Sequence, residues 1–215
     1  MIARQTLLVL SLALVAAQPL AAKDKVKQPT IETVTCEGVF GPQSSEALVK
    51  QTFGAENVVT GTVHGPEGIE MLATTVFSDD PDRSMEFGWW DEENLRYLSY
   101  VELAPSQQTP GGVRIGMSVA EVEAINGAPF TINGFWWDYG GNAMIEKGAL
   151  ANPDEGCRFW IRFATMEEYS EDIDVTPIAG EVTVPSSEPL LEQLGARVVS
   201  ISLAYPWPDE LPQPE

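Results

Sequence analysis

The side chains that most often carry chemistry in proteins are scarce in this sequence. His64 is its only histidine, and it ends a β-rich run directly before Gly65 and a proline. A Ser-His-Asp triad would need His64, but no serine stands in a Gly-x-Ser-x-Gly elbow. A metal site usually needs several nitrogen or sulfur donors, and one histidine beside two cysteines that are expected to pair does not supply them. We therefore expect no catalytic residue, no metal site and no cofactor.

Acidic residues gather in segments that suggest two further kinds of site. Residues 79–82, Asp-Asp-Pro-Asp, offer oxygen ligands for Ca²⁺, but their spacing lacks the Asp-x-Asp-x-Asp-Gly pattern and is typical of a turn. Residues 89–93, Trp-Trp-Asp-Glu-Glu, and 136–138, Trp-Trp-Asp, set carboxylates beside tryptophan. Glycoside hydrolases combine paired acids with an aromatic sugar platform. A secreted carbohydrate-active protein, lectin or glycosidase-like, is therefore the alternative function.

Strand parity separates two tryptophans from the other aromatic residues. Successive side chains of a strand point to opposite faces. In residues 85–90 one face carries Met85, Phe87 and Trp89, and in residues 157–163 one face carries Cys157, Phe159, Ile161 and Phe163. These apolar sets are the expected core. Trp90 and Trp160 are then left on the opposite face.

The surroundings of Trp160 are typical of an interface anchor. Arg158 and Arg162 share its face, and tryptophan and arginine dominate the binding energy of many protein interfaces. We expect Trp90, Trp160, Arg158, Arg162 and Trp137 to form a binding face for a protein partner. The alternative is that a loop or the other half of the chain covers the rings of Trp90 and Trp160.

The N-terminus has the composition of a secretory signal peptide. Arg4 precedes an apolar run from Leu7 to Ala17, and small residues lead to Ala22. We expect cleavage after Ala22, or alternatively after Ala17, so that residues 1–22 are removed and the protein is periplasmic or secreted. No cysteine lies at the cleavage site and no later apolar run is long enough to span a bilayer, so we expect no membrane anchor.

Charge and cysteine content fit an exported chain. The sequence has 32 acidic and 12 basic residues, a net charge of −20, which disfavours nucleic acid and anionic membranes as partners. Solubility is the simplest role of this charge, and attraction to a basic partner or to cations is the alternative. Cys36 and Cys157 are the only cysteines, and in an oxidising compartment such a widely spaced pair predicts one structural disulfide.

The element pattern predicts an α+β fold made of two similar units. Each unit begins with a short helix that has a serine N-cap and a glycine stop, and each continues in antiparallel strands. Residues 45–55 and 118–128 align with five identities in eleven, which favours an internal duplication with the helices on one face of the sheets. The second helix carries a capping box at Ser118 and Glu121.

The expected boundaries are a first unit at 23–104, a linker at 105–112, a second unit at 113–205 and a Pro-rich tail at 206–215. Strands are expected at 31–39, 57–64, 68–77, 83–90, 95–103, 130–133, 135–139, 143–147, 157–163 and 197–205. In the last strand Val199, Ile201 and Leu203 are predicted to share one face, with Ser200 and Ser202 on the other.

The segment Gly116-Met117-Ser118, followed by Val122, Gly127 and Pro129, resembles the start of SmpA/BamE-like and β-lactamase-inhibitory-protein-like domains. The resemblance covers about fifty residues of the second half, and the first half has no Gly-Met-Ser. It implies a short helical segment packed on a small antiparallel sheet. The inhibitory proteins carry this unit twice and grip a partner protein on an aromatic-rich concave sheet. The resemblance therefore implies an interaction module of the bacterial envelope, without chemistry of its own.

Overall fold

The computed structural model describes residues 31–152 and 156–213. The expected signal peptide, residues 1–22, lies outside them. The helices are α1 (Glu46–Phe53), α2 (Val119–Asn126) and α3 (Pro189–Gln193). The strands are β1 (Glu32–Thr33), β2 (Val58–His64), β3 (Glu70–Val76), β4 (Met85–Asp91), β5 (Arg96–Glu102), β6 (Gln107–Gln108), β7 (Thr131–Asn133), β8 (Ala143–Met144), β9 (Arg158–Ala164), β10 (Thr183–Pro185) and β11 (Arg197–Ala204).

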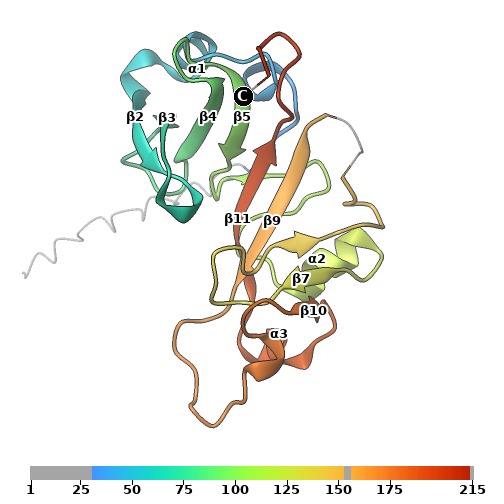
Figure 1. The fold of residues 1–215 in the computed structure, drawn as a ribbon. Coiled ribbons are helices and arrows are strands. Elements are labelled where there is room, and N and C mark those ends of the chain that lie inside the picture. Colours follow the sequence, from blue (N-terminus) through green and yellow to red (C-terminus); the bar gives the residue numbers. More distant parts are fainter. Residues whose placement is uncertain (1–30, 153–155, 214–215) are drawn as a thin grey trace, which may run out of the picture.

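One antiparallel sheet joins strands from both ends of the chain. Its six strands run in the order β2-β3-β4-β5-β11-β9, and Figure 1 shows β11 and β9 continuing the sheet that β2 to β5 begin. A smaller sheet has the order β10-β7-β8, and β1 pairs in parallel with β6, inside the expected linker. Helices combined with mainly antiparallel sheets confirm the predicted α+β class.

The two eight-residue helices, α1 and α2, begin and end where the sequence predicts. The Ser45 hydroxyl accepts a hydrogen bond from the Leu48 N–H at 3.3 Å, which caps α1. At α2 the Ser118 hydroxyl accepts from the Glu121 N–H, and the Glu121 carboxylate accepts from the Ser118 N–H at 2.8 Å, so the capping box is present. A reciprocal cap of this kind satisfies two helix donors that would otherwise lack partners.

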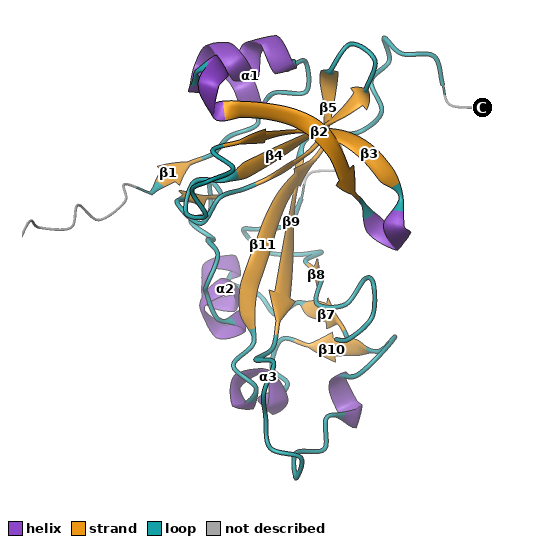
Figure 2. Cartoon of the chain, turned by 90° about the vertical axis from the view of Figure 1, so that its left-hand side faces the viewer, coloured by secondary structure: helices purple, strands orange, loops and turns teal. Residues whose placement is uncertain are grey.

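A single hydrophobic core lies on one side of the six-stranded sheet and extends beneath the helices. Alternate residues of its strands are fully buried, among them Phe87, Val101, Leu203, Ile201 and Phe163. Val49 of α1 and Val122 of α2 are part of the same core. Figure 2 shows α1 against the upper strands and α2 beside the lower part of β11. The buried rows therefore leave the opposite side chains of each strand on a second face.

The predicted disulfide is present in the structure. It joins Cys36 to Cys157, with 6.1 Å between their Cα atoms and a sequence separation of 121 residues. Cys157 immediately precedes β9, and Cys36 lies between β1 and α1. The bond therefore ties the N-terminal segment to the strand that carries Trp160.

Four predicted details of the strands are wrong. The expected strand at 31–39 is reduced to β1, because Gly38 has a φ of 60° and begins a 3-10 helix over residues 38–40, so Cys36 does not lie on a strand. The expected strand at 143–147 is reduced to β8.

Residues 135–139 are not a strand, because Trp136 has a φ of 64° and the chain turns there after one bridge from Phe135 to Ala179. In β11 the pairing with β9 shifts between Val198 and Ser200. This bulge places Val198 in the core and leaves Val199 43% exposed, so Val199 does not share the buried face.

Candidate binding face

The face of the six-stranded sheet opposite the core is called the open face below. Its central row follows from the strand register, in which Glu86 of β4 lies opposite Glu102 of β5, Glu102 lies opposite Ser202 of β11, and Ser202 lies opposite Trp160 of β9. The buried residues next to them in sequence, such as Phe87 and Ile161, point the other way. One residue from each of four adjacent strands therefore lines this row.

Trp160 is the most exposed side chain of the central row, with 40% of its surface accessible. Met144 of β8 is 42% exposed and lines the same pocket of about 360 Å³ as Trp160 and Arg158. Both apolar side chains are exposed to solvent, although the protein has a large hydrophobic core. Burying the exposed indole against a partner would gain free energy, which suits a binding anchor.

Arg162, two residues beyond Trp160 on the same face of β9, comes together with Trp137. The Arg162 Nε donates to the Gly140 carbonyl at 3.1 Å, and Trp137 Nε1 donates to the Gly134 carbonyl at 2.8 Å. Both residues line a second pocket, of about 230 Å³, together with Trp136, whose ring is 50% exposed. Four of the five predicted face residues, Trp160, Arg158, Arg162 and Trp137, thus lie on or beside β9.

Trp90 is separate from this group. Its ring is partly buried and lies 5.1 Å, centroid to centroid, from the ring of Trp207 in the C-terminal segment. The side chain of Gln43 donates to Glu210 at 3.1 Å, which holds the same segment against the first half of the chain. The indole N–H of Trp90 is buried without a hydrogen-bond partner in the described residues. For Trp90, the structure has the covered arrangement that the sequence left as the alternative.

Two carboxylates on the open face were not singled out from the sequence. The Tyr100 hydroxyl donates to Glu86 Oε1 at 2.7 Å, and the Ser202 hydroxyl donates to Glu102 Oε1 at 2.5 Å. Burial and the charge of Glu86 raise the pKa of Glu102, against the opposing effects of Ser202 and Arg162. Burial and the bond to Glu86 also raise the pKa of the Tyr100 phenol. Strand parity places Glu86 on the same face as Trp90. The place of Glu102 beside Glu86 becomes visible only when the pairing of β4 with β5 is known.

The turn after β2 contacts the loop that follows β7. β2 and β9 are opposite edges, yet Glu67, in the turn after β2, accepts a hydrogen bond from the Tyr139 hydroxyl at 3.0 Å. Tyr139 belongs to the loop whose Gly140 carbonyl binds Arg162, so this loop lies on the open-face side of β9. In Figure 2 the turn between β2 and β3 reaches toward the loop that follows β7. The hairpin and this loop therefore border the open face.

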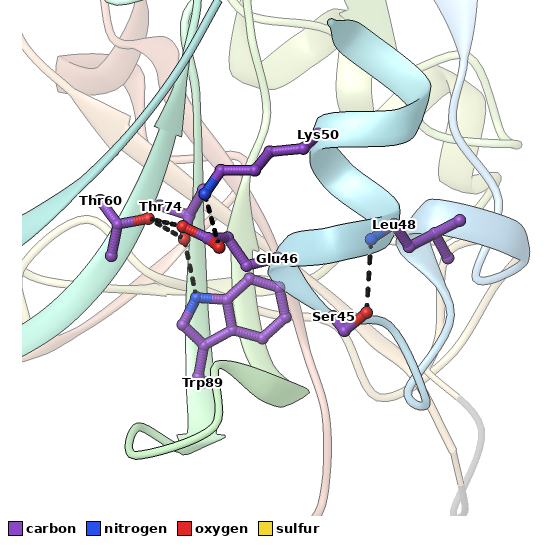
Figure 3. A network of polar contacts seen from close by, with 7 residues as sticks. All are labelled: Ser45, Glu46, Leu48, Lys50, Thr60, Thr74 and Trp89. Carbon is purple, nitrogen blue, oxygen red and sulfur yellow. Dashed lines mark hydrogen bonds and ion pairs between the residues drawn. The ribbon is translucent and has the colours of Figure 1, made fainter. Parts of the chain in front are cut away.

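The other residues that the sequence singled out take part in contacts that stabilise the fold. Trp89 is buried, and its indole N–H donates to the Thr74 hydroxyl at 3.0 Å (Figure 3). Thr74 shares a hydrogen bond with Thr60, which donates to the Glu46 carboxylate at 2.6 Å. Burial raises the pKa of Glu46, but the bonds from Lys50 and Thr60 outweigh it, so the pKa is lowered overall. This network fixes α1 on the sheet.

The carboxylates of Asp91 and of the 79–82 segment likewise bind neighbouring groups of the chain. The Asp91 carboxylate accepts from Arg96 Nε at 2.6 Å, and the hydrogen bonds from Arg96 and Asn94 lower its pKa. Asp80 accepts from the Asp82 N–H at 3.2 Å, as a turn residue does. His64 is exposed at the end of β2. No group of three or more His, Cys, Asp or Glu side chains within the described ranges is placed to hold a metal ion.

Comparisons with known proteins assign no relative: no family model, no curated protein and no solved structure matches the chain. Among residues 31–152 and 156–213, no helix has the length and apolar character needed to cross a membrane.

Proposed function

We propose that this protein is an exported, non-enzymatic binding module of the bacterial cell envelope, which holds a protein partner on the open face of its sheet. The observation that carries the proposal is the exposure of Trp160, 40%, in a row flanked by Arg158 and Arg162. An exposed tryptophan beside arginines, bordered by two pockets, has the composition of an interface centre. The disulfide between Cys36 and Cys157 supports an oxidising, extracytoplasmic location.

Repeated backbone contacts support the proposal that the chain contains an internal duplication. Ser45, the N-cap of α1, forms a bridge with Arg96 at the start of β5, and Ser118, the N-cap of α2, forms a bridge with Arg197 at the start of β11. Each helix thus contacts the first residue of the strand that closes its unit. The two closing strands pair with each other at Glu102 and Ser202. In this arrangement the open face is built by both units jointly.

The proposal is tested by the dependence of partner capture on Trp160. The mature protein, immobilised and incubated with a detergent extract of envelopes, should retain a partner that Trp160→Ala does not retain. Val199→Ala is the matched control, because Val199 is exposed to a similar degree, 43%, on the bulge of β11. Both variants should keep the melting temperature of the parent. Equal capture by the parent and by Trp160→Ala would show that the open face does not bind the partner. A collapse in the melting temperature of Trp160→Ala would show that Trp160 is a structural residue.

A carbohydrate-active protein is the second candidate, favoured by one observation. Glu86 and Glu102 face each other on the open face, one of them with a raised pKa, near an exposed tryptophan. Paired carboxylates beside an aromatic ring are the equipment of glycosidases. The Trp-Asp segments named from the sequence contribute less, since Trp89 is buried and Asp91 binds Arg96. A glycan-array screen with binding lost in Trp160→Ala would favour this candidate, and an array without signal would count against it.

A further inference from the structure

Strand β2 forms one edge of the six-stranded sheet, and no described strand pairs with its outer side (Figure 1). Its seven residues, Val58–His64, pair with β3 without a bulge and include no proline and no Asp, Glu, Lys or Arg. Val59 is 59% exposed, and no described atom lies within 4 Å of a Cβ added at Gly61. Proteins usually protect an edge strand with charge, proline, a bulge or a covering segment. The outer edge of β2 therefore has the features of a strand that pairs with another chain.

The opposite edge of the same sheet, β9, is covered by the chain itself. The Phe163 N–H donates to the Gly141 carbonyl at 2.8 Å, on the side of β9 away from β11. Near the start of β9 the side chain of Asn152 binds both backbone groups of Phe159. Its Nδ2 donates to the Phe159 carbonyl at 2.9 Å, and its Oδ1 accepts from the Phe159 N–H at 2.8 Å. The fold therefore satisfies the outer backbone groups of one edge and leaves β2 without such a cover in the described part of the chain.

The register of β2 with β3 shows which backbone groups of β2 point outwards. In an antiparallel pair, residues that bond to the facing strand alternate with residues whose N–H and C=O point away from it. The Phe77 N–H donates to the Asn57 carbonyl at 2.9 Å, so the odd-numbered residues of β2 are the ones that bond to β3. The N–H and C=O of Thr60 and Thr62 therefore point outwards. Among the described residues, no backbone group of another segment bonds to them.

The central residues of β2 form a palindrome, Val-Thr-Gly-Thr-Val from Val59 to Val63. A two-fold axis at Gly61 would therefore set each of these residues opposite one of its own type in an antiparallel second copy. Thr60 would face Thr62 of the other copy, and their outward N–H and C=O groups would bond to each other. Facing threonines are a favourable cross-strand pair, and the facing valines would bury apolar surface. An interface between identical copies needs self-complementarity of this kind.

We propose that two copies of this protein pair antiparallel through the outer edges of β2, about a two-fold axis at Gly61, so that their sheets become one continuous sheet. This pairing goes beyond the proposed function and does not depend on it. The chain has a net charge of −20, but β2 brings no charged side chain to the contact, and charges more than about 8 Å apart are largely screened at physiological ionic strength. One strand per copy is a small contact, so we expect a weak dimer, with a Kd of about 10–100 μM, that tightens as salt is added.

Sedimentation equilibrium of the oxidised mature protein tests the pairing at concentrations below and above this Kd. The parent should dimerise, and V59E/V63E should bind itself at least about tenfold more weakly, because the two-fold register sets like charges directly opposite each other. V59E/V63K should dimerise again, because each glutamate then faces a lysine of the other copy. V182E/V199E is the matched control: it adds the same charge at exposed valines outside β2 and should dimerise like the parent. Melting curves followed by circular dichroism check that all variants are folded.

Cross-linking through Gly61 gives a second measurement that does not depend on charge. The two Gly61 residues would form a pair without hydrogen bonds between them, with Cα atoms about 4.5 Å apart, which a disulfide can span. Gly61→Cys should therefore form a covalent dimer on air oxidation, and the exposed Val199→Cys should not. A parent that stays monomeric, or a V182E/V199E variant that dissociates as V59E/V63E does, would overturn the pairing. Failure of V59E/V63K to restore the dimer, or equal cross-linking of the two cysteine variants, would overturn the two-fold register at Gly61.

Discussion

At the residue scale, Glu102 is an ionisable group whose environment in the sheet differs strongly from that in the unfolded chain. Burial and Glu86 raise its pKa above the ordinary value of 4.5, so the folded state holds this proton more tightly than the unfolded state. The stability that results is present below the ordinary pKa and is lost as the pH rises through the folded-state pKa. At neutral pH, therefore, Glu102 makes the folded state less stable than it is below the ordinary pKa.

Glu102→Gln should consequently raise the free energy of unfolding at neutral pH by about 0.2–1 kcal/mol, the range of a cross-strand pair. The gain should shrink below the ordinary pKa of 4.5, where the parent is also neutral at this position. Urea titrations followed by circular dichroism at both pH values measure the difference. The exposed Glu93, changed to Gln, is the control and should give no such pH-dependent gain. A variant less stable than the parent at neutral pH would contradict the sign of the argument.

Gly88 tests how tightly the open face is packed. A Cβ added at Gly88 would lie 2.0 Å from Cε1 of Tyr100, the cross-strand neighbour whose hydroxyl binds Glu86. We expect Gly88→Ala to lower the free energy of unfolding by about 1–3 kcal/mol, as overpacking does. Gly61→Ala on β2 is the matched control, because nothing lies within 4 Å of its added Cβ. Thermal unfolding of the two variants should differ clearly, and equal melting temperatures would mean that the Tyr100 ring moves aside freely.

At the element scale, the C-terminal segment is a cover for one end of the open face. Trp207 contacts Trp90 at a centroid distance of 5.1 Å, and such aromatic pairs contribute about 0.5–1.5 kcal/mol beyond the area that they bury. Trp207→Ala should therefore lower the free energy of unfolding by at least that amount and expose the Trp90 indole to water. The fluorescence of Trp90 should shift to longer wavelength and become more sensitive to quenching by acrylamide. In a Trp90→Phe background the same change should have a smaller spectral effect; an undiminished effect would assign the signal to another tryptophan.

Local sequence signals predict most of the elements and about half of the face. Strands β2 to β5 follow from alternation between clear turns, and α2 follows from its capping box, because these signals lie within a few adjacent residues. The strand predicted at 135–139 is wrong, because the β propensity of its aromatic residues does not reveal the φ of 64° at Trp136. Parity found Trp160, which needs only its own strand. Glu102 was missed, because its place opposite Glu86 depends on the pairing of β4 with β5, whose register shifts between Gly88 and Trp89, and because Ser202, its other neighbour, lies one hundred residues further along the chain.

At the scale of the whole molecule, the six-stranded sheet makes the two halves one unit. β11 lies between β5 and β9, so the last strand of the described chain completes a sheet begun by the first half. The disulfide from Cys36 to Cys157 crosses the same boundary, over a separation of 121 residues. Noncovalent pairing and the covalent bond therefore act in parallel, and their contributions can be separated by removing the bond.

The double variant Cys36→Ser/Cys157→Ser should lose stability without losing cooperativity. In the chain-entropy model, closing a loop of this length lowers the entropy of the unfolded chain and so stabilises the folded state by about 4–5 kcal/mol. This stabilisation is lost when the bond is absent. Because β5 and β11 still pair, calorimetry should show a single transition at a lower temperature, with equal calorimetric and van't Hoff enthalpies. The parent with the bond intact is the control. Two separated transitions in the variant would show that the halves fold independently, and the open face, which needs strands from both, would then depend on the disulfide for its assembly.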